Sequence, residues 1–232
     1  MHSDKSRQDV AHFRYLGFIT AANITFQLVS DATAGKLVSY GAWAGSVALV
    51  YFPFTYVFSD VLTEVYGYAV ARRVLWMTLI ASIAAGLIYQ FAVWMPSAPG
   101  FDAGDAYQRV FGVVPRVLLG GWIAVFAGDI SNNYTLAKMK VLTNGRHLWM
   151  RTIGSTIVGQ GVNTALFYLI GLYGIIPNNL LLPGIVFGWI FKSCIEALMT
   201  PATYVVVRKL KEAEGVDFYD RGTDFNPFRL VE

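Results

Sequence analysis

The chain has 232 residues, of which 55% are hydrophobic and only 14% are charged, with a net charge of +3. Because soluble domains carry about 25% charged residues, this composition excludes a disordered protein and a protein that coats nucleic acid. The single cysteine, Cys194, excludes an intrachain disulfide.

Six apolar stretches are long enough to cross a bilayer, since a helix needs about 20 mostly apolar residues to span ~30 Å of hydrocarbon. They lie at residues 13–30, 42–62, 74–95, 117–137, 152–173 and 185–207. We therefore predict an all-α, polytopic integral membrane protein with six transmembrane helices, in which residues 1–232 form a single transmembrane domain. Pro53 lies within the second stretch and predicts a kink or break there, because proline removes a backbone donor.

Two segments outside these stretches have a recognisable pattern. The loop after Met95 contains FDAGDAYQRVFG, where Asp105 predicts the cap of a short interfacial helix. The tail from Lys211 to Glu232 alternates charged residues with Phe and Gly, so we expect it to be only weakly ordered against the membrane.

The basic residues predict the orientation of the chain. Fourteen of the 18 Lys and Arg residues lie in the N-terminal segment up to Arg14, in the second and fourth loops, or in the tail. Since short cytoplasmic loops carry the excess of Lys and Arg, both termini are predicted to be cytoplasmic.

Charged side chains within or at the edge of the predicted spans are candidates for function, because each costs about 2.5–3.5 kcal/mol in hydrocarbon. They are Asp60, Glu64, Asp129, Lys192 and Glu196. Residues three or four apart share a helix face, and this spacing groups Asn23 with Gln27, Asp60 with Glu64, Asp129 with Asn132 and Asn133, Gln160 with Asn163, and Lys192 with Glu196. We predict that these faces point inward together. Asp129, Asn163, Lys192 and Glu196 fall near the membrane midplane, where transporters bind their substrates, whereas Asp60 and Glu64 lie closer to the cytoplasmic end unless a kink at Pro53 draws them inward.

Structural interpretations stand beside the functional one. Lys192 and Glu196 can neutralise one another, and Asp60 and Glu64 can pair with Arg72 and Arg73. The amides can simply join helices. Asp129 is the strongest candidate, because its own predicted helix offers it no basic neighbour.

The remaining expectations concern packing and excluded chemistry. Phe54, Tyr56 and Trp122 are candidates for stacking on a ligand, and small residues at 120, 124, 128, 155 and 159 predict a close approach of the fourth and fifth helices or a dimer surface. His2, His12 and His147 lie outside the spans, so no metal site or cofactor is indicated. No G-x-S-x-G, Walker A or G-x-G-x-x-G motif occurs, which argues against an enzyme and leaves an intramembrane carboxylate dyad as a remote alternative.

Long blocks of the chain resemble a known family. They are FPFTYVFSDVLTEVYGYAVARRVLW (52–76), AGDISNNYTLAKMK (127–140), GQGVNTALFYLI (159–170), FKSCIEALMTPATYVVVRKLK (191–211) and EGVDFYDRGTDFNPF (214–228). These blocks are similar to the queuosine precursor transporter family, which is vitamin-uptake-transporter-like. Some members of that family carry aspartate at the positions of Asn132 and Asn163, and glutamine at that of Asp129.

The resemblance implies a fold similar to the substrate-binding S-components of energy-coupling-factor vitamin importers. It implies import of 7-cyano-7-deazaguanine or 7-aminomethyl-7-deazaguanine across the inner membrane by a homodimer, without nucleic acid as a partner. We expect a carboxylate such as Asp129 or Glu196 to bind the N–H edge of the base, and amides such as Asn132, Gln160 or Asn163 to bind its acceptors. H⁺ or Na⁺ coupling is open, and the alternatives are a binding subunit that needs an energising partner and a transporter of another nucleobase-like or vitamin-like compound.

Overall fold

The computed structural model describes residues 13–33, 36–40, 43–112, 115–174 and 178–229. The expectations for His2, His12 and the basic residues before residue 13 lie outside these ranges. The described elements, in chain order, are α1 (Leu16–Thr33), β1 (Leu37–Tyr40), β2 (Trp43–Ser46), a 3₁₀ turn (Val47–Val50), α2 (Phe52–Val61), a π-helical segment η2 (Leu62–Tyr66), α3 (Tyr68–Trp94), α4 (Gly104–Phe111), α5 (Pro115–Leu142), α6 (Leu148–Leu166), a second π-helical segment η3 (Phe167–Leu172) and α7 (Asn178–Glu214).

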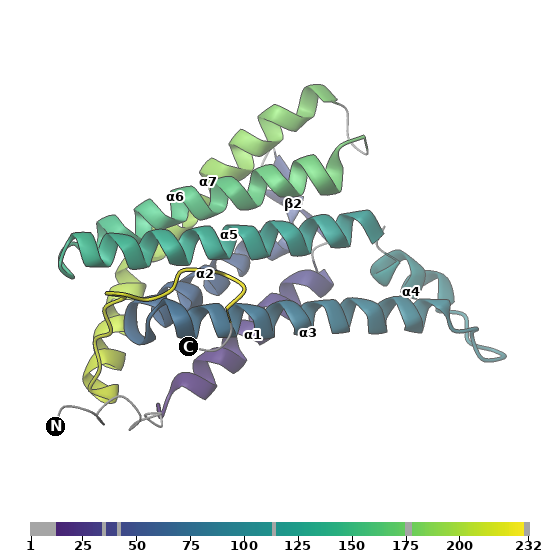
Figure 1. Cartoon of the computed structure of the whole chain (residues 1–232). Helices are drawn as coiled ribbons and strands as arrows, with labels where there is room; N and C mark the ends of the chain where they lie inside the picture. Colours follow the sequence, from purple (N-terminus) through teal and green to yellow (C-terminus); the bar gives the residue numbers. More distant parts are fainter. Residues whose placement is uncertain (1–12, 34–35, 41–42, 113–114, 175–177, 230–232) are drawn as a thin grey trace.

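The long helices form a bundle in which α3, α5 and α6 run alongside one another and α7 packs on α6 (Figure 1). The helix α4 lies at one end of this bundle, and the yellow C-terminal tail lies toward the other. The strands β1 and β2 pair in an antiparallel hairpin, with Leu37 opposite Ser46. The fold is therefore almost entirely helical.

The second predicted span differs from the structure. The helix expected over residues 42–62 begins only at Phe52, and the residues before it form β2 and a 3₁₀ turn. Pro53 stands in the first turn of α2, where its missing N–H has no intrahelical partner to lose. The prediction of a kink or break at Pro53 is therefore confirmed as a break, because the α-helix starts at Phe52 and does not extend further toward the N-terminus. The short helix predicted after Met95 is α4. Asp105 lies in its first turn and is not its cap as predicted, because the N-cap is Ala103.

The distribution of side chains matches a protein surrounded by lipid. Within the part of the chain that the structure describes, three helical segments are long and apolar enough to cross a membrane, namely Tyr68–Trp94, Leu148–Leu172 and Asn178–Glu214. Large apolar side chains face outward, including Phe18 at 76% exposure and Leu198 at 78%, whereas many Asn, Gln, Ser, Thr, Asp and Glu side chains are buried. A soluble protein shows the opposite tendency, so the structure agrees with the predicted membrane protein.

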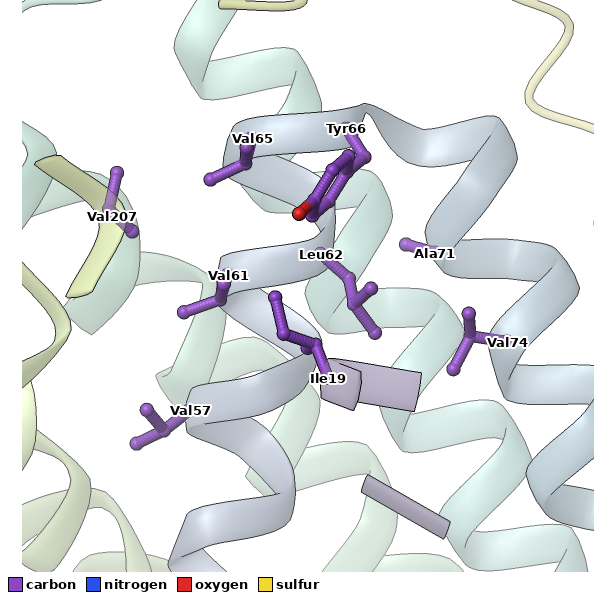
Figure 2. Close-up of a cluster of buried hydrophobic side chains, with 9 residues drawn as sticks. All are labelled: Ile19, Val57, Val61, Leu62, Val65, Tyr66, Ala71, Val74 and Val207. Carbon is purple, nitrogen blue, oxygen red and sulfur yellow. The ribbon is translucent and has the colours of Figure 1, made fainter. Parts of the chain in front are cut away.

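An apolar cluster holds α1, α2, α3 and α7 together at the end of the bundle where α3 begins. Figure 2 shows its members: Ile19, Val57, Val61, Leu62, Val65, Tyr66, Ala71, Val74 and Val207. Val61 and Val65 are fully buried. The cluster places the start of α1 against the last third of α7, where Glu214 accepts hydrogen bonds from the backbone N–H groups of Arg14 and Tyr15.

The tail after α7 is bound tightly, which corrects the expectation of weak order. Asp220 accepts hydrogen bonds from the backbone N–H of Tyr68 at the start of α3, at 3.1 and 3.2 Å. Arg72 donates to the carbonyl oxygens of Asp224 and Asn226, both at 2.7 Å. The first turn of a helix leaves N–H groups without intrahelical partners. The tail supplies an acceptor for one of these groups, the N–H of Tyr68.

The helices α5 and α6 approach each other closely through glycine. A Cβ atom added at Gly128 would lie 2.7 Å from Cβ of Asn163, and one added at Gly159 would lie 2.7 Å from Cβ of Asn132. This contact agrees with the packing predicted from the small residues. It also brings the polar faces of the two helices together.

We expect Gly128→Ala to destabilise the fold by about 1–3 kcal/mol, the usual cost of overpacking, because neither Asn163 nor the α6 backbone can retreat easily. The matched control on the same helix is Gly121→Ala, where the nearest atom to an added Cβ lies 4.0 Å away. Thermal unfolding of both variants in detergent measures the difference. Equal midpoints would show that α5 and α6 are not held at this spacing.

Candidate functional site

Buried polar side chains from α2, α5, α6 and α7, together with the half-buried Lys192, meet in one group, which we call the central polar cluster. It consists of Tyr56, Asp60, Asp129, Asn132, Gln160, Asn163, Lys192 and Glu196. Each helix contributes residues three or four positions apart, so that they share one inward face. All eight were predicted as candidate site residues, and their proximity now follows from the packing of these four helices.

Two carboxylates of the cluster are held by hydrogen bonds between helices. Asp60 on α2 accepts a hydrogen bond of 2.7 Å from Nδ2 of Asn132 on α5. Glu196 on α7 accepts one of 2.6 Å from Thr156 and one of 3.2 Å from Nε2 of Gln160, both on α6. These bonds fix the carboxylate positions without neutralising their charge.

The ammonium of Lys192 has partners other than Glu196. It donates to Oδ1 of Asn163 at 3.1 Å and lies 4.9 Å from the centre of the Phe52 ring. The ion pair suggested between Lys192 and Glu196, which are both on α7 and both described, is therefore not formed. Lys192 stays available as a donor toward the cluster.

The carboxylates outnumber the cations in the central polar cluster. Asp129 lies beside the hydroxyl of Tyr56, and it interacts electrostatically with both Asp60 and Glu196. Lys192 is the one cation among the eight residues. Three carboxylates in a buried site repel one another unless protons, a cation or hydrogen-bond donors compensate them. The cluster is thus suited to a ligand rich in N–H groups.

Amide oxygens of the cluster are also left without partners. Oδ1 of Asn132 and Oε1 of Gln160 are buried and accept no hydrogen bond. A buried acceptor without a partner costs free energy, and each of these belongs to a side chain whose other atom is already held in place. The two oxygens are therefore oriented acceptors for a donor that enters the site.

Four further candidates lie outside this cluster. Asn133 accepts a hydrogen bond of 2.8 Å from Ser59 and so joins α5 to α2. On α1, Asn23 is buried, and Gln27 donates to Asp31 at 2.8 Å. Phe54 packs against Phe26. The Asn133 contact agrees with the interpretation that amides join helices, whereas the Gln27 contact lies within α1.

Trp122 also lies away from the central polar cluster. Its ring packs over Gly86 of α3, where an added Cβ would lie 2.7 Å from it. It lines a cavity together with Asp31 and Ser82. Its predicted role in stacking on a ligand of the central cluster finds no support in this position.

Glu64 belongs to a different group, which we call the ionic cluster. It comprises Glu64, Lys140, Arg151, Lys211 and Asp217. Glu64 lies 2.8 Å from both Arg151 and Lys211, and 3.5 Å from Lys140. The suggested ion pair of Glu64 with Arg72 or Arg73 is replaced by these partners from α5, α6 and α7.

The tail closes the ionic cluster. Asp217 lies 2.7 Å from Lys140 and 2.8 Å from Lys211. Partial burial raises the pKa of Asp217, but the hydrogen bonds from Lys140 and Lys211 outweigh it and hold the pKa below its ordinary value. Asp217 is therefore ionised at neutral pH and binds the tail to the bundle.

Sequence reasoning missed several of these residues. Thr156 lies four positions before Gln160 on the same face of α6, so the helical spacing could have found it. Asp31 lies four positions after Gln27 but one position beyond the predicted end of the first span. The partners of Glu64 gave no local signal, because Arg151 and Lys211 are 87 and 147 positions away.

Comparison with known proteins adds an independent line of evidence. A sequence model of the family described as "Putative vitamin uptake transporter" matches residues 46–206. The chain is 26% identical over 157 residues to the "Probable queuosine precursor transporter" of Bacillus subtilis (strain 168), covering 67% of this chain and 69% of that protein. It is 24% identical over 159 residues to the "Queuosine precursor transporter" of Escherichia coli (strain K12), covering 68% of this chain and 66% of that protein. No solved structure matches the chain.

Proposed function

Because the chain belongs to the vitamin uptake transporter family, we propose that it is a membrane transporter that imports a queuosine precursor. The relatives named as queuosine precursor transporters support this cargo. The precursor expected from the sequence is 7-cyano-7-deazaguanine or 7-aminomethyl-7-deazaguanine. The observation that carries the proposal is the central polar cluster, with its excess of carboxylates and its unpartnered amide oxygens.

A 7-deazaguanine is complementary to this set of groups. Its pyrimidine edge presents N–H donors beside a carbonyl acceptor, and a carboxylate can accept two such donors side by side. Asp129 and Glu196 are the carboxylates assigned to that edge. The amide nitrogens of Asn132 and Gln160 already donate to Asp60 and Glu196, so these amides are assigned to further N–H groups of the base through their oxygens, and not to its acceptors as expected from the sequence. Lys192 is assigned to the carbonyl oxygen, since its ammonium can only donate.

The transport cycle is proposed to be alternating access around the central polar cluster, coupled to an ion. Six segments cross the membrane in this proposal: α1, α2 with η2, α3, α5, α6 with η3, and α7. The end of the bundle that carries the ionic cluster faces the cytoplasm, because the excess of Lys and Arg marks that side. Both termini are then cytoplasmic, the membrane is the inner membrane, and the fold is of the S-component type, assembled as a homodimer.

Uptake of labelled 7-deazaguanines tests this function. The chain is expressed alone in cells that cannot make queuosine, and accumulation is measured with and without an uncoupler. We expect accumulation that collapses when the ion gradient is removed. Cells carrying an empty vector supply the background, and membrane insertion is verified in parallel.

If uptake fails, a binding measurement distinguishes a missing energising partner from a wrong cargo. Binding of a labelled 7-deazaguanine to the purified, inserted protein, without uptake, would identify it as a binding subunit that needs an energising partner. The absence of both binding and uptake would exclude 7-deazaguanines as its cargo.

A further inference from the structure

A small cavity lies outside the central polar cluster, between α1, α3, α4 and α5, and a few polar side chains stand in its otherwise apolar lining. Its volume is about 30 Å³, which is enough for one small occupant such as a water molecule or a bare ion. Asp31, Ser82, Gln90, Phe111 and Trp122 are among the residues that line it. No part of the proposed substrate chemistry uses this cavity.

Oxygen atoms without partners face one another here. Oδ1 of Asp31 accepts a hydrogen bond from Gln27, whereas Oδ2 is buried and accepts none. The hydroxyl of Ser82 lies beside this carboxylate. Neither Oγ of Ser82 nor Oδ2 of Asp31 has a hydrogen-bond partner of standard geometry, although Ser82 is only 5% exposed. A hydroxyl and a carboxylate that are adjacent but not bonded leave room for an occupant that both can coordinate.

The charge of the site calls for a cation. Asp31 forms no ion pair with a Lys or Arg side chain among the residues that the structure describes. A carboxylate at membrane depth is costly unless a partner neutralises it. The potential ligands in this cavity are oxygen atoms, which small hard cations prefer, and the single negative charge matches a monovalent ion.

The cavity lies toward the end of the bundle that carries α4, away from the C-terminal tail and the ionic cluster (Figure 1). The helix α4 covers it there, and the carbonyl oxygen of Phe111 accepts a hydrogen bond of 2.6 Å from Nε2 of Gln90 on α3. Under the orientation given above, this is the external side of the membrane. Movement of α4 would admit an ion from outside the cell.

We propose that Asp31 and Ser82 form a Na⁺-binding site between α1 and α3, separate from the substrate cluster. Gln27 positions the Asp31 carboxylate through its hydrogen bond. The helix α5 borders this site with Trp122 and carries Asp129 and Asn132 toward the central polar cluster, so the two sites share one rigid element. An ion bound at Asp31 therefore acts on the element that holds the substrate.

Thermal unfolding of the purified chain in detergent tests this proposal without any substrate. The midpoint is followed as NaCl replaces choline chloride at constant ionic strength, and KCl replaces it in a parallel series. A ligand that binds only the folded state raises the midpoint as its concentration increases. We expect Na⁺ to raise the midpoint more than K⁺ does, and we expect Asp31→Asn to lose this increase.

Two further variants define the result. Ser82→Ala is expected to raise the half-saturating Na⁺ concentration by about 10-fold, a loss typical of residues that support a metal site. Asp105→Asn, which removes an exposed carboxylate on α4, is the control and should retain the full response to Na⁺.

Three outcomes would overturn the site. They are equal midpoints in NaCl and choline chloride for the unmodified chain, a full Na⁺ response in Asp31→Asn, and a response that is lost in Asp129→Asn but kept in Asp31→Asn. The last would move the ion to the central polar cluster. None depends on which substrate is carried, so failure here is distinguishable from failure of the proposed function.

Discussion

Glu64→Gln should destabilise the folded chain by about 3–5 kcal/mol, the range expected when one partner of a buried ion pair is removed. Glu64, Lys140 and Arg151 are each 1% exposed. Without the Glu64 carboxylate, three cations remain close together with Asp217 as their one described acidic partner. Their repulsion acts on α5, α6 and α7 at once.

Unfolding in mixed detergent micelles measures this effect. The matched control is Glu212→Gln, which breaks the 3.0 Å ion pair between Glu212 and Arg208. The side chain of Arg208 is 82% exposed and that of Glu212 is 65% exposed. An exposed i,i+4 pair contributes about 0.3–0.5 kcal/mol, so the control should unfold close to the unmodified chain. Equal unfolding of Glu64→Gln and Glu212→Gln would contradict the arrangement of the ionic cluster.

Asp129→Asn should abolish uptake while the protein stays folded and inserted. The substitution keeps the size of a side chain that is 8% exposed, but it replaces a carboxylate that can accept two N–H groups with an amide that cannot. Loss of one bidentate contact to a base costs about 1–3 kcal/mol, and a site without its base-binding carboxylate is expected not to load the substrate.

The measurement combines labelled 7-deazaguanine uptake with thermal unfolding of the same variant. Asp105→Asn makes the same chemical change at an exposed position on α4 and should transport like the unmodified chain. Uptake at the normal rate by Asp129→Asn would remove Asp129 from the mechanism. A large drop in the unfolding midpoint would show that its role is structural.

Helical spacing predicted which residues share a face, and seven of the eight residues of the central polar cluster were chosen on that basis, whereas Tyr56 was a candidate for stacking. Spacing could not say which faces meet. Phe54 and Trp122 have the same aromatic character as Tyr56, yet Phe54 packs on Phe26 and Trp122 on Gly86. Only the close approach of α5 and α6 at Gly128 and Gly159, and the packing of α2 and α7 against them, decides the difference.

The sequence alone determined the class of the protein. Long apolar runs make it a helical membrane protein, and polar residues at helical spacing identify the inward faces, because both properties are local to one segment. The tertiary structure decided how the long-range charges pair and where the tail binds. Glu64 finds Arg151 and Lys211 rather than the nearby Arg72, and Arg72 instead binds carbonyl oxygens at Asp224 and Asn226. Those choices depend on the packing of helices far apart in the chain, where every buried charge must find a partner that local spacing does not reveal.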